Sequence, residues 1–263
     1  MKRPIGLLDS GVGGLTVLHT VRSLLPEENI IYVGDKANCP YGDKSKEELF
    51  VLASRIVEYF ITQNVKMIVH ACNTTTASVL PDLQKKYPDQ KFIGVIYSTV
   101  DAFIRRNKKS VLVIGTETTI TSNTYQRYIN ECNESITVYA LATPKLVPLV
   151  ESGAYKEGIY DVLHSYLDDY RDVIDSIILG CTHYPILTNQ IQQVLPNIDY
   201  ISSSEAIGKE VKDYLIKNNL SNSNNIGKIK IYTTGDIEEF KYSSSGFFDY
   251  TGLEIEYLNL DSE

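Results

Sequence analysis

The segment SIILGCTHYP, residues 176–185, runs from apolar residues through a glycine into a cysteine, a threonine and a histidine. The segment MIVHACNTTT, residues 67–76, has the same order, with a cysteine between an apolar run and hydroxyl and amide residues. A short apolar run closed by turn residues is typical of a buried strand. The two segments therefore predict two similar strand–loop–helix units, each with a thiol directly after its strand.

Short apolar runs alternate with segments of helical spacing outward from these two stretches. In the first half, we predict strands over 5–9, 30–35, 65–71 and 91–96, and helices beginning near 15, 45 and 74. In the second half, we predict strands over 110–115, 136–141, 176–180 and 198–203, with helices over 122–132, 155–170 and 186–195. A helix over 205–217 and a strand over 228–236 follow. This alternation predicts an α/β fold of two similar units with mainly parallel sheets, in which loops after the strands meet at a cleft.

Composition limits the classes of protein that this chain can belong to. The 263 residues carry a net charge of −8, which argues against nucleic acid or an anionic membrane as the main partner. Four cysteines lie far apart without any CxxC pair, so we expect free thiols in a reducing cytoplasm rather than disulfides or a metal framework. The sequence contains neither a recognisable signal peptide nor an apolar run of about 18 residues, so we expect a cytoplasmic protein.

The pair Cys181 and His183 is compatible with three kinds of chemistry. It could supply half of a metal site, a nucleophile with its base, or an acid/base pair. Zinc is disfavoured because a third ligand at suitable spacing is missing, and we predict no metal. The two residues alone do not decide between the remaining roles.

Cys72 begins a predicted helix, where the helix dipole should lower its pKa. Asn73, Thr74 and Thr75 follow it and could hold a carboxylate, or the segment could simply be a packed cysteine with capping threonines. Asp9 ends the first predicted strand and could do chemistry or cap the next helix. Cys39 is interpreted as structural, and Cys132 as a core residue on a helix face.

Five motifs together resemble the bacterial glutamate racemases, cofactor-independent enzymes of the aspartate/glutamate racemase superfamily. The motifs are GLLDSGVGGLTV, YVGDKANCPYG, ACNTTTA, LVPLVESG and GCTHYPIL, and they occur in the family's order and spacing. The resemblance covers residues 5 to about 236. It implies a discontinuous first domain, 1–95 plus 207–263, and a second domain, 96–206, with the active site in the cleft between them.

The resemblance also implies roles for individual residues. Cys72 and Cys181 match the two catalytic bases, assisted by Asp9 and His183 respectively, and Glu151 matches a further acid near the site. The positions that match residues holding the amino acid are Asp9, Ser10, Tyr41, Gly42, Asn73, Thr74, Thr75, Thr182 and His183, together with Thr118 or a neighbour in GTETTITS. The implied substrate is L- or D-glutamate, the implied cofactor is none, and a homodimer is expected. Lys36 and Asn38 depart from the residues that the family commonly carries there.

Racemisation itself calls for two groups, because a hydrogen leaves one face of the stereocentre and another arrives on the opposite face. Two thiols can do this if one is a thiolate while the other is protonated. A broader-specificity amino-acid racemase, a single-thiol hydrolase or decarboxylase, and a non-catalytic amino-acid-binding module are the alternatives. Two equivalent cysteine loops favour the racemase.

Overall fold

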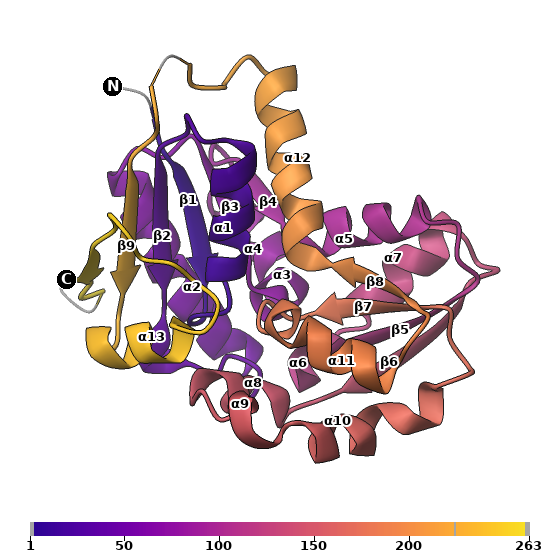
Figure 1. The fold of residues 1–263 in the computed structure, drawn as a ribbon. Coiled ribbons are helices and arrows are strands. Elements are labelled where there is room, and N and C mark those ends of the chain that lie inside the picture. The colour runs from indigo at the N-terminus through magenta and orange to yellow at the C-terminus, as the bar shows by residue number, and fades with distance from the viewer. Residues whose placement is uncertain (1–2, 224, 261–263) are drawn as a thin grey trace.

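The computed structural model describes residues 3–223 and 225–260, and it contains two parallel β-sheets (Figure 1). The first sheet has the strand order β10-β9-β2-β1-β3-β4, and every neighbouring pair is parallel. Its strands are β1 (Ile5–Asp9), β2 (Ile30–Gly34), β3 (Met67–His70), β4 (Phe92–Gly94), β9 (Ile229–Thr233) and β10 (Ile255–Tyr257). The chain thus leaves this sheet after β4 and returns to it with β9, beside β2.

The second sheet has the order β6-β5-β7-β8 and is also parallel throughout. Its strands are β5 (Ser110–Gly115), β6 (Thr137–Ala142), β7 (Ser176–Gly180) and β8 (Asp199–Ser202). The order is second, first, third, fourth, which is also the order of β2-β1-β3-β4. The predicted α/β fold with two similar parallel units is therefore confirmed.

Helices connect the strands and cover the sheets. In the first unit these are α1 (Leu15–Leu24), α2 (Lys46–Thr62), α3 (Asn73–Ser78), α4 (Leu80–Lys86) and the 3-10 turn η1 (Lys36–Asn38). Between the strands of the second sheet lie α6 (Glu117–Thr121), α7 (Thr124–Cys132), α8 (Leu146–Glu151), α9 (Tyr155–Gly158), α10 (Tyr160–Leu167), η2 (Asp168–Tyr170), η3 (Tyr184–Leu187) and α11 (Thr188–Val194). Two helices, α5 (Val95–Ile104) and α12 (Ser203–Lys217), lie where the chain passes between the sheets, and α13 (Ile237–Ser244) follows β9.

The apolar core is continuous from one sheet to the other. Val69 of β3 and Val113 of β5 belong to one buried cluster, together with Phe103 of α5 and Val211 of α12. The helices α5 and α12 pack on each other, and α12 also packs on α1 (Figure 1). This packing holds the carboxyl ends of the strands of the two units at a common interface.

Most predicted elements are present, with some differences. The predicted strand 91–96 ends at Gly94, because Val95, Ile96, Val100 and Phe103 are buried at helical spacing and form α5. The predicted helix 155–170 is divided into α9, α10 and η2. The capping box predicted at Ser45 and Glu48 is confirmed at the start of α2.

The prediction that Cys132 is a core residue is wrong. It is the last residue of α7 and is exposed, whereas Tyr125 and Ile129 form the buried face of that helix. None of the helices in the described ranges is long and apolar enough to span a membrane.

Candidate active site

The two cysteines lie at equivalent places in the two units. Cys72 follows β3 and Cys181 follows β7, and these are the third strands of their sheets in chain order. Both thiols are buried, with exposed fractions of 4% and 6%. The carboxyl edge of a parallel sheet is where ligands bind in open α/β folds, so the topology places both thiols where a substrate would lie.

Cys181 belongs to a chain of polar contacts. Its Sγ lies 3.5 Å from Nδ1 of His183, and Nε2 of His183 lies 2.6 Å from Oε1 of Glu151. The other carboxylate oxygen of Glu151 accepts a hydrogen bond of 2.7 Å from Nζ of Lys36. A thiol, an imidazole, a carboxylate and an ammonium group thus follow one another through buried or nearly buried side chains.

The charges in this chain set the protonation of its members. Burial alone would lower the pKa of His183, but Cys181 and Glu151 outweigh it and hold that pKa well above its usual value. Burial alone would raise the pKa of Glu151, but the contacts with His183 and Lys36 lower it to about 2. Glu151 is therefore a carboxylate at neutral pH, and His183 carries a proton beside the Cys181 sulfur.

Cys72 has different surroundings. Its Sγ lies 4.0 Å from the Ser10 hydroxyl, and its carbonyl oxygen accepts hydrogen bonds from the side chains of Thr75 and Thr76. Burial, together with the charges of Asp9 and Cys181, raises the pKa of Cys72 to about 12. The prediction that the helix start lowers this pKa is therefore wrong: α3 has only six residues, and burial outweighs the hydrogen bonds from Thr75.

Asp9 connects the first unit to the Cys181 loop. Its carboxylate accepts hydrogen bonds of 3.0 and 3.2 Å from the hydroxyl of Thr182. Asp9 is fully buried, and this burial raises its pKa to about 6 despite the nearby His183. The N-cap residue of α1 is Gly14, so the alternative role of Asp9 as the cap of that helix is not the one it takes.

The glycines of the DSGVGG segment allow the second unit to approach. A Cβ on Gly13 would lie 2.6 Å from Nδ1 of His183, and a Cβ on Gly11 would lie 2.4 Å from Oε1 of Glu151. The backbone N–H of Val12 donates a hydrogen bond of 3.1 Å to Glu151. These glycines match no dinucleotide fingerprint, and their requirement here is steric.

The remaining predicted binding residues lie around the same interface. The Asn73 side-chain oxygen accepts a hydrogen bond of 2.7 Å from Tyr125, while its buried Nδ2 has no partner among the described residues. Thr118 donates to the carbonyl oxygen of Gly42 at 2.6 Å. The hydroxyl groups of Thr74 and Thr116 lie 2.9 Å apart. Each of these contacts joins the first unit to the second.

Tyr41 is buried and donates its hydroxyl hydrogen bond to Asp35, which also accepts one from Thr234. This arrangement fixes the turn that carries Gly42 against the second unit. The hydroxyl of Tyr41 is therefore used within the first unit, by Asp35.

Sequence patterns included Thr116 only as a neighbour of Thr118 in GTETTITS, and they gave Lys36 no role. Thr116 follows β5 as Ser10 follows β1, so a closer comparison of the two units would have singled it out. Lys36 had only one signal, its departure from the residues common at that position in similar sequences. The sequence places it 115 residues from Glu151, and only the fold brings the two together.

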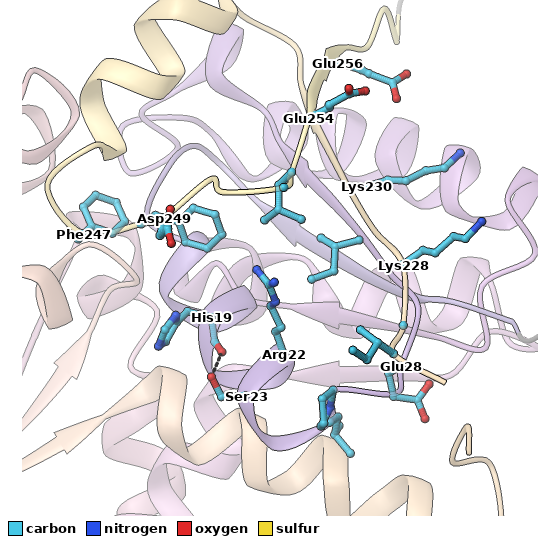
Figure 2. A pocket seen from close by; sticks show the side chains of 18 residues that line it. His19, Arg22, Ser23, Glu28, Lys228, Lys230, Phe247, Asp249, Glu254 and Glu256 are labelled. Carbon is cyan, nitrogen blue, oxygen red and sulfur yellow. Dashed lines mark hydrogen bonds between the residues drawn. The ribbon is translucent and has the colours of Figure 1, made fainter. Parts of the chain in front are cut away.

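A hollow of about 1280 Å³ lies elsewhere on the molecule, between α1, β9 and the segment that leads to β10. Figure 2 shows Arg22 reaching into it and His19 and Phe247 along its side. The residues predicted to be catalytic do not line it. Over residues 3–223 and 225–260, no group of three or more His, Cys, Asp or Glu side chains is arranged to hold a metal ion.

Two sulfur atoms, one from each unit, lie at the interface, where each can exchange a proton with a bound molecule. Each thiol has an acid or base close by: His183 at Cys181, and Asp9 acting electrostatically on Cys72. The free amide donor of Asn73 lies beside Cys72 in the chain, where it could bind a carboxylate. The fold and the site define a class of proteins that perform acid/base chemistry between two α/β units.

Comparison with known proteins agrees with this class. The model of the Asp/Glu/hydantoin racemase family matches residues 15–210, and the chain belongs to that family. Within it, the chain is similar to glutamate racemases over its full length. The enzyme of Carboxydothermus hydrogenoformans is 38% identical over 262 residues, which cover 98% of this chain and 96% of the relative.

Solved structures of glutamate racemases have the same fold. An isoform from Bacillus anthracis superimposes with a TM-score of 0.92 at 34% identity and 100% coverage of both chains. The Francisella tularensis enzyme, solved in complex with D-glutamate, has a TM-score of 0.91 at 34% identity and covers 100% of this chain and 99% of its own.

Proposed function

We propose that this protein is a glutamate racemase that interconverts L- and D-glutamate without a cofactor, with Cys72 and Cys181 as its two catalytic bases. The observation that carries the proposal is the placement of two buried thiols after equivalent strands of two units that face each other. The complex of a 34% identical racemase with D-glutamate supports the choice of substrate. The alternative is a racemase of broader amino-acid specificity, which would also racemise aspartate.

In this reaction the thiolate of one cysteine takes the α-hydrogen of glutamate as a proton. The electron pair of the broken C–H bond stays on Cα, and the other thiol gives its proton to the opposite face. The first cysteine ends as a thiol and the second as a thiolate, so the reverse reaction starts from the state that the forward reaction leaves. Before the next turnover in the same direction, His183 at Cys181 and Asp9 at Cys72 exchange protons with solvent and return each cysteine to its starting state.

The carbanion needs electrostatic stabilisation, since the α-hydrogen of an amino acid is a very weak acid. Asp9 binds the substrate in addition to its role as an acid/base partner. The other residues that we assign to substrate binding are Ser10, Tyr41, Gly42, Asn73, Thr74, Thr75, Thr118, Thr182 and His183. The buried Nδ2 of Asn73, which has no hydrogen-bond partner among the described residues, supports this assignment most directly. A substrate carboxylate would satisfy that donor.

We also propose that the enzyme supplies D-glutamate for peptidoglycan and works in the cytoplasm, where both thiols stay reduced. The proposed domains are 1–95 plus 207–263 and 96–206. The membership of the strands in the two sheets supports this division, with its boundaries at α5 and α12. The homodimer expected from the resemblance stays a prediction.

The test is circular dichroism of separate L- and D-glutamate solutions with purified enzyme, a reducing agent and no added cofactor. We expect both signals to decay to zero, because the equilibrium constant between enantiomers is one. Parallel solutions of L- and D-aspartate should keep their signals over the same time. Loss of the aspartate signal at a similar rate would replace the proposal with a broad-specificity racemase, and a constant glutamate signal would refute it.

A further inference from the structure

Lys36 occupies an unusual place for a lysine. Its side chain is only 10% exposed, and its Nζ lies 2.7 Å from Oε2 of Glu151 and 3.2 Å from Oε1 of Glu239. Lys36 belongs to η1 of the first unit, whereas Glu151 ends α8 of the second. The ion pair therefore joins the two units directly at the chain that leads to Cys181.

We propose that Lys36 is a positioning residue of the racemase: its ammonium group holds the Glu151 carboxylate on His183 and limits how strongly that carboxylate retains the His183 proton. The inference rests on the proposed function and extends it to a residue outside the substrate contacts. Oε1 of Glu151 is used by His183 and by the backbone of Val12, so Lys36 takes the remaining oxygen. All the acceptor atoms of the carboxylate are thereby fixed.

The charge balance shows what a cation does at this point. Asp9 and Glu151 are both buried carboxylates at the interface, and the negative charge of Glu151 raises the pKa of Asp9. Lys36 compensates part of this charge. The titratable or charged groups that face the cluster from neighbouring elements are Asp9, Tyr32, Cys39, Cys72, Cys181, His183 and Glu239.

Removing a buried positive charge raises the pKa of every acid near it. In the Lys36→Met variant, we therefore expect both the acidic and the alkaline limbs of the profile of kcat/KM against pH to move to higher pH. The expected shift is at most about one pH unit, the lower end of the range for a neighbouring charge, because Lys36 contacts Glu151 and acts on His183 and Asp9 through it. At neutral pH we expect kcat to fall about tenfold with little change in KM, since Glu151 loses one of its three contacts.

The controls separate charge from packing. Lys36→Arg keeps the cation and should restore the limbs, and Lys36→Gln keeps a donor without charge and should shift them as Lys36→Met does. Lys86→Met removes a surface lysine that pairs with Glu58 at 3.1 Å and should leave the profile unchanged. A loss of activity by the same factor at every pH, or an unshifted profile in both neutral variants, would overturn the proposal.

A measurement without turnover keeps this inference separate from the proposed function. The protein has four histidines, so the titration of each imidazole can be followed by NMR in ¹⁵N-labelled enzyme, with His183→Asn giving the assignment. We expect the His183 pKa to be higher in Lys36→Met than in the wild type. A shifted His183 in a protein that fails to racemise glutamate would refute the proposed function alone, and an unshifted His183 in an active racemase would refute the role of Lys36 alone.

Discussion

Cys72 and Cys181 follow the same strand in two units of the same topology, yet the proton chemistry around them differs. The Cys181 sulfur has an imidazole at 3.5 Å, backed by Glu151 and Lys36, whereas the Cys72 sulfur lies 4.0 Å from the Ser10 hydroxyl. The two units therefore have the same topology, but the acid and base groups around their two thiols differ. Transfer of hydrogen between opposite faces of Cα uses two groups, but it does not need two identical ones.

The largest effects are expected when one of the two sulfur atoms is removed at a time. We expect Cys72→Ser and Cys181→Ser each to lower racemisation by at least about 10³-fold in both directions, because a serine hydroxyl is a far weaker acid than a thiol. Circular dichroism with each enantiomer measures this. Cys132→Ser is the matched control, since Cys132 is exposed at the end of α7, and it should keep wild-type activity. A single-thiol mechanism would leave one of the two site variants active.

Removing the acid/base partner of each cysteine tests whether the two thiols differ in their proton chemistry. We expect Asp9→Asn and His183→Asn each to lower kcat/KM by about 10²-fold, a typical contribution of general acid/base catalysis. The ratio kcat/KM must stay equal for the two enantiomers, so a direction-dependent effect has to be sought in isotope effects. In each variant, proton transfer to the cysteine that has lost its partner becomes slower. Racemisation of the α-deuterated enantiomer whose hydrogen this cysteine removes should then show a full primary isotope effect, and racemisation of the other enantiomer a reduced one.

The two variants should therefore rank α-deuterated L- and D-glutamate in opposite orders. The wild type measured with both deuterated enantiomers is the reference. The same order in both variants would contradict the pairing of Asp9 with Cys72 and of His183 with Cys181.

A smaller effect is expected from the close approach of the two units. Gly13→Ala would place a Cβ 2.6 Å from Nδ1 of His183, so the imidazole has to move away from its position beside Cys181. We expect a loss of about tenfold or more in kcat, because displacements of about 1 Å in a catalytic group are costly. Gly158→Ala is the control, because its Cβ would meet no atom within 4 Å. Full activity of Gly13→Ala would show that the close packing of Gly13 against His183 is unimportant for catalysis.

The smallest expected effect is on pH dependence. Burial raises the pKa of Asp9 to about 6, so Asp9 becomes protonated as the pH falls through that value and can no longer accept a proton. We expect kcat/KM to decline below about pH 6 in the wild type, and this limb to be missing from the residual activity of Asp9→Asn. Initial rates between pH 5 and pH 8 at constant ionic strength provide the measurement. An unchanged limb in the variant would assign the titration to another group.

Much of the fold follows from local sequence patterns. The buried strands are short apolar runs such as Ile5–Asp9 and Ser176–Gly180, and a capping box marks the start of α2. The start of α5 was missed because Val95 and Ile96 continue the apolar run of β4, and the change from strand to helix at Gly94 depends on packing against α12. The exposure of Cys132 likewise depends on which face of α7 packs inward.

The site was predictable where chain order alone places a residue at a strand end, as for Asp9, Cys72 and Cys181. The Lys36–Glu151 pair was not, because the two residues are distant in sequence and meet only through the docking of two units. The pKa of Cys72 was predicted in the wrong direction because sequence shows a helix start but not the depth of burial. Contacts between units and desolvation are thus the properties that sequence patterns convey least.

Racemisation of L-glutamate in D₂O shows whether two thiols act on opposite faces of Cα. Proton NMR and mass spectrometry after the first few per cent of turnover would report the label in each enantiomer separately. We expect D-glutamate to carry solvent deuterium at Cα from the first turnovers while the remaining L-glutamate keeps its hydrogen. Product that retains the original hydrogen, or substrate that gains deuterium as fast as product, would contradict this expectation and indicate a single base that serves both faces.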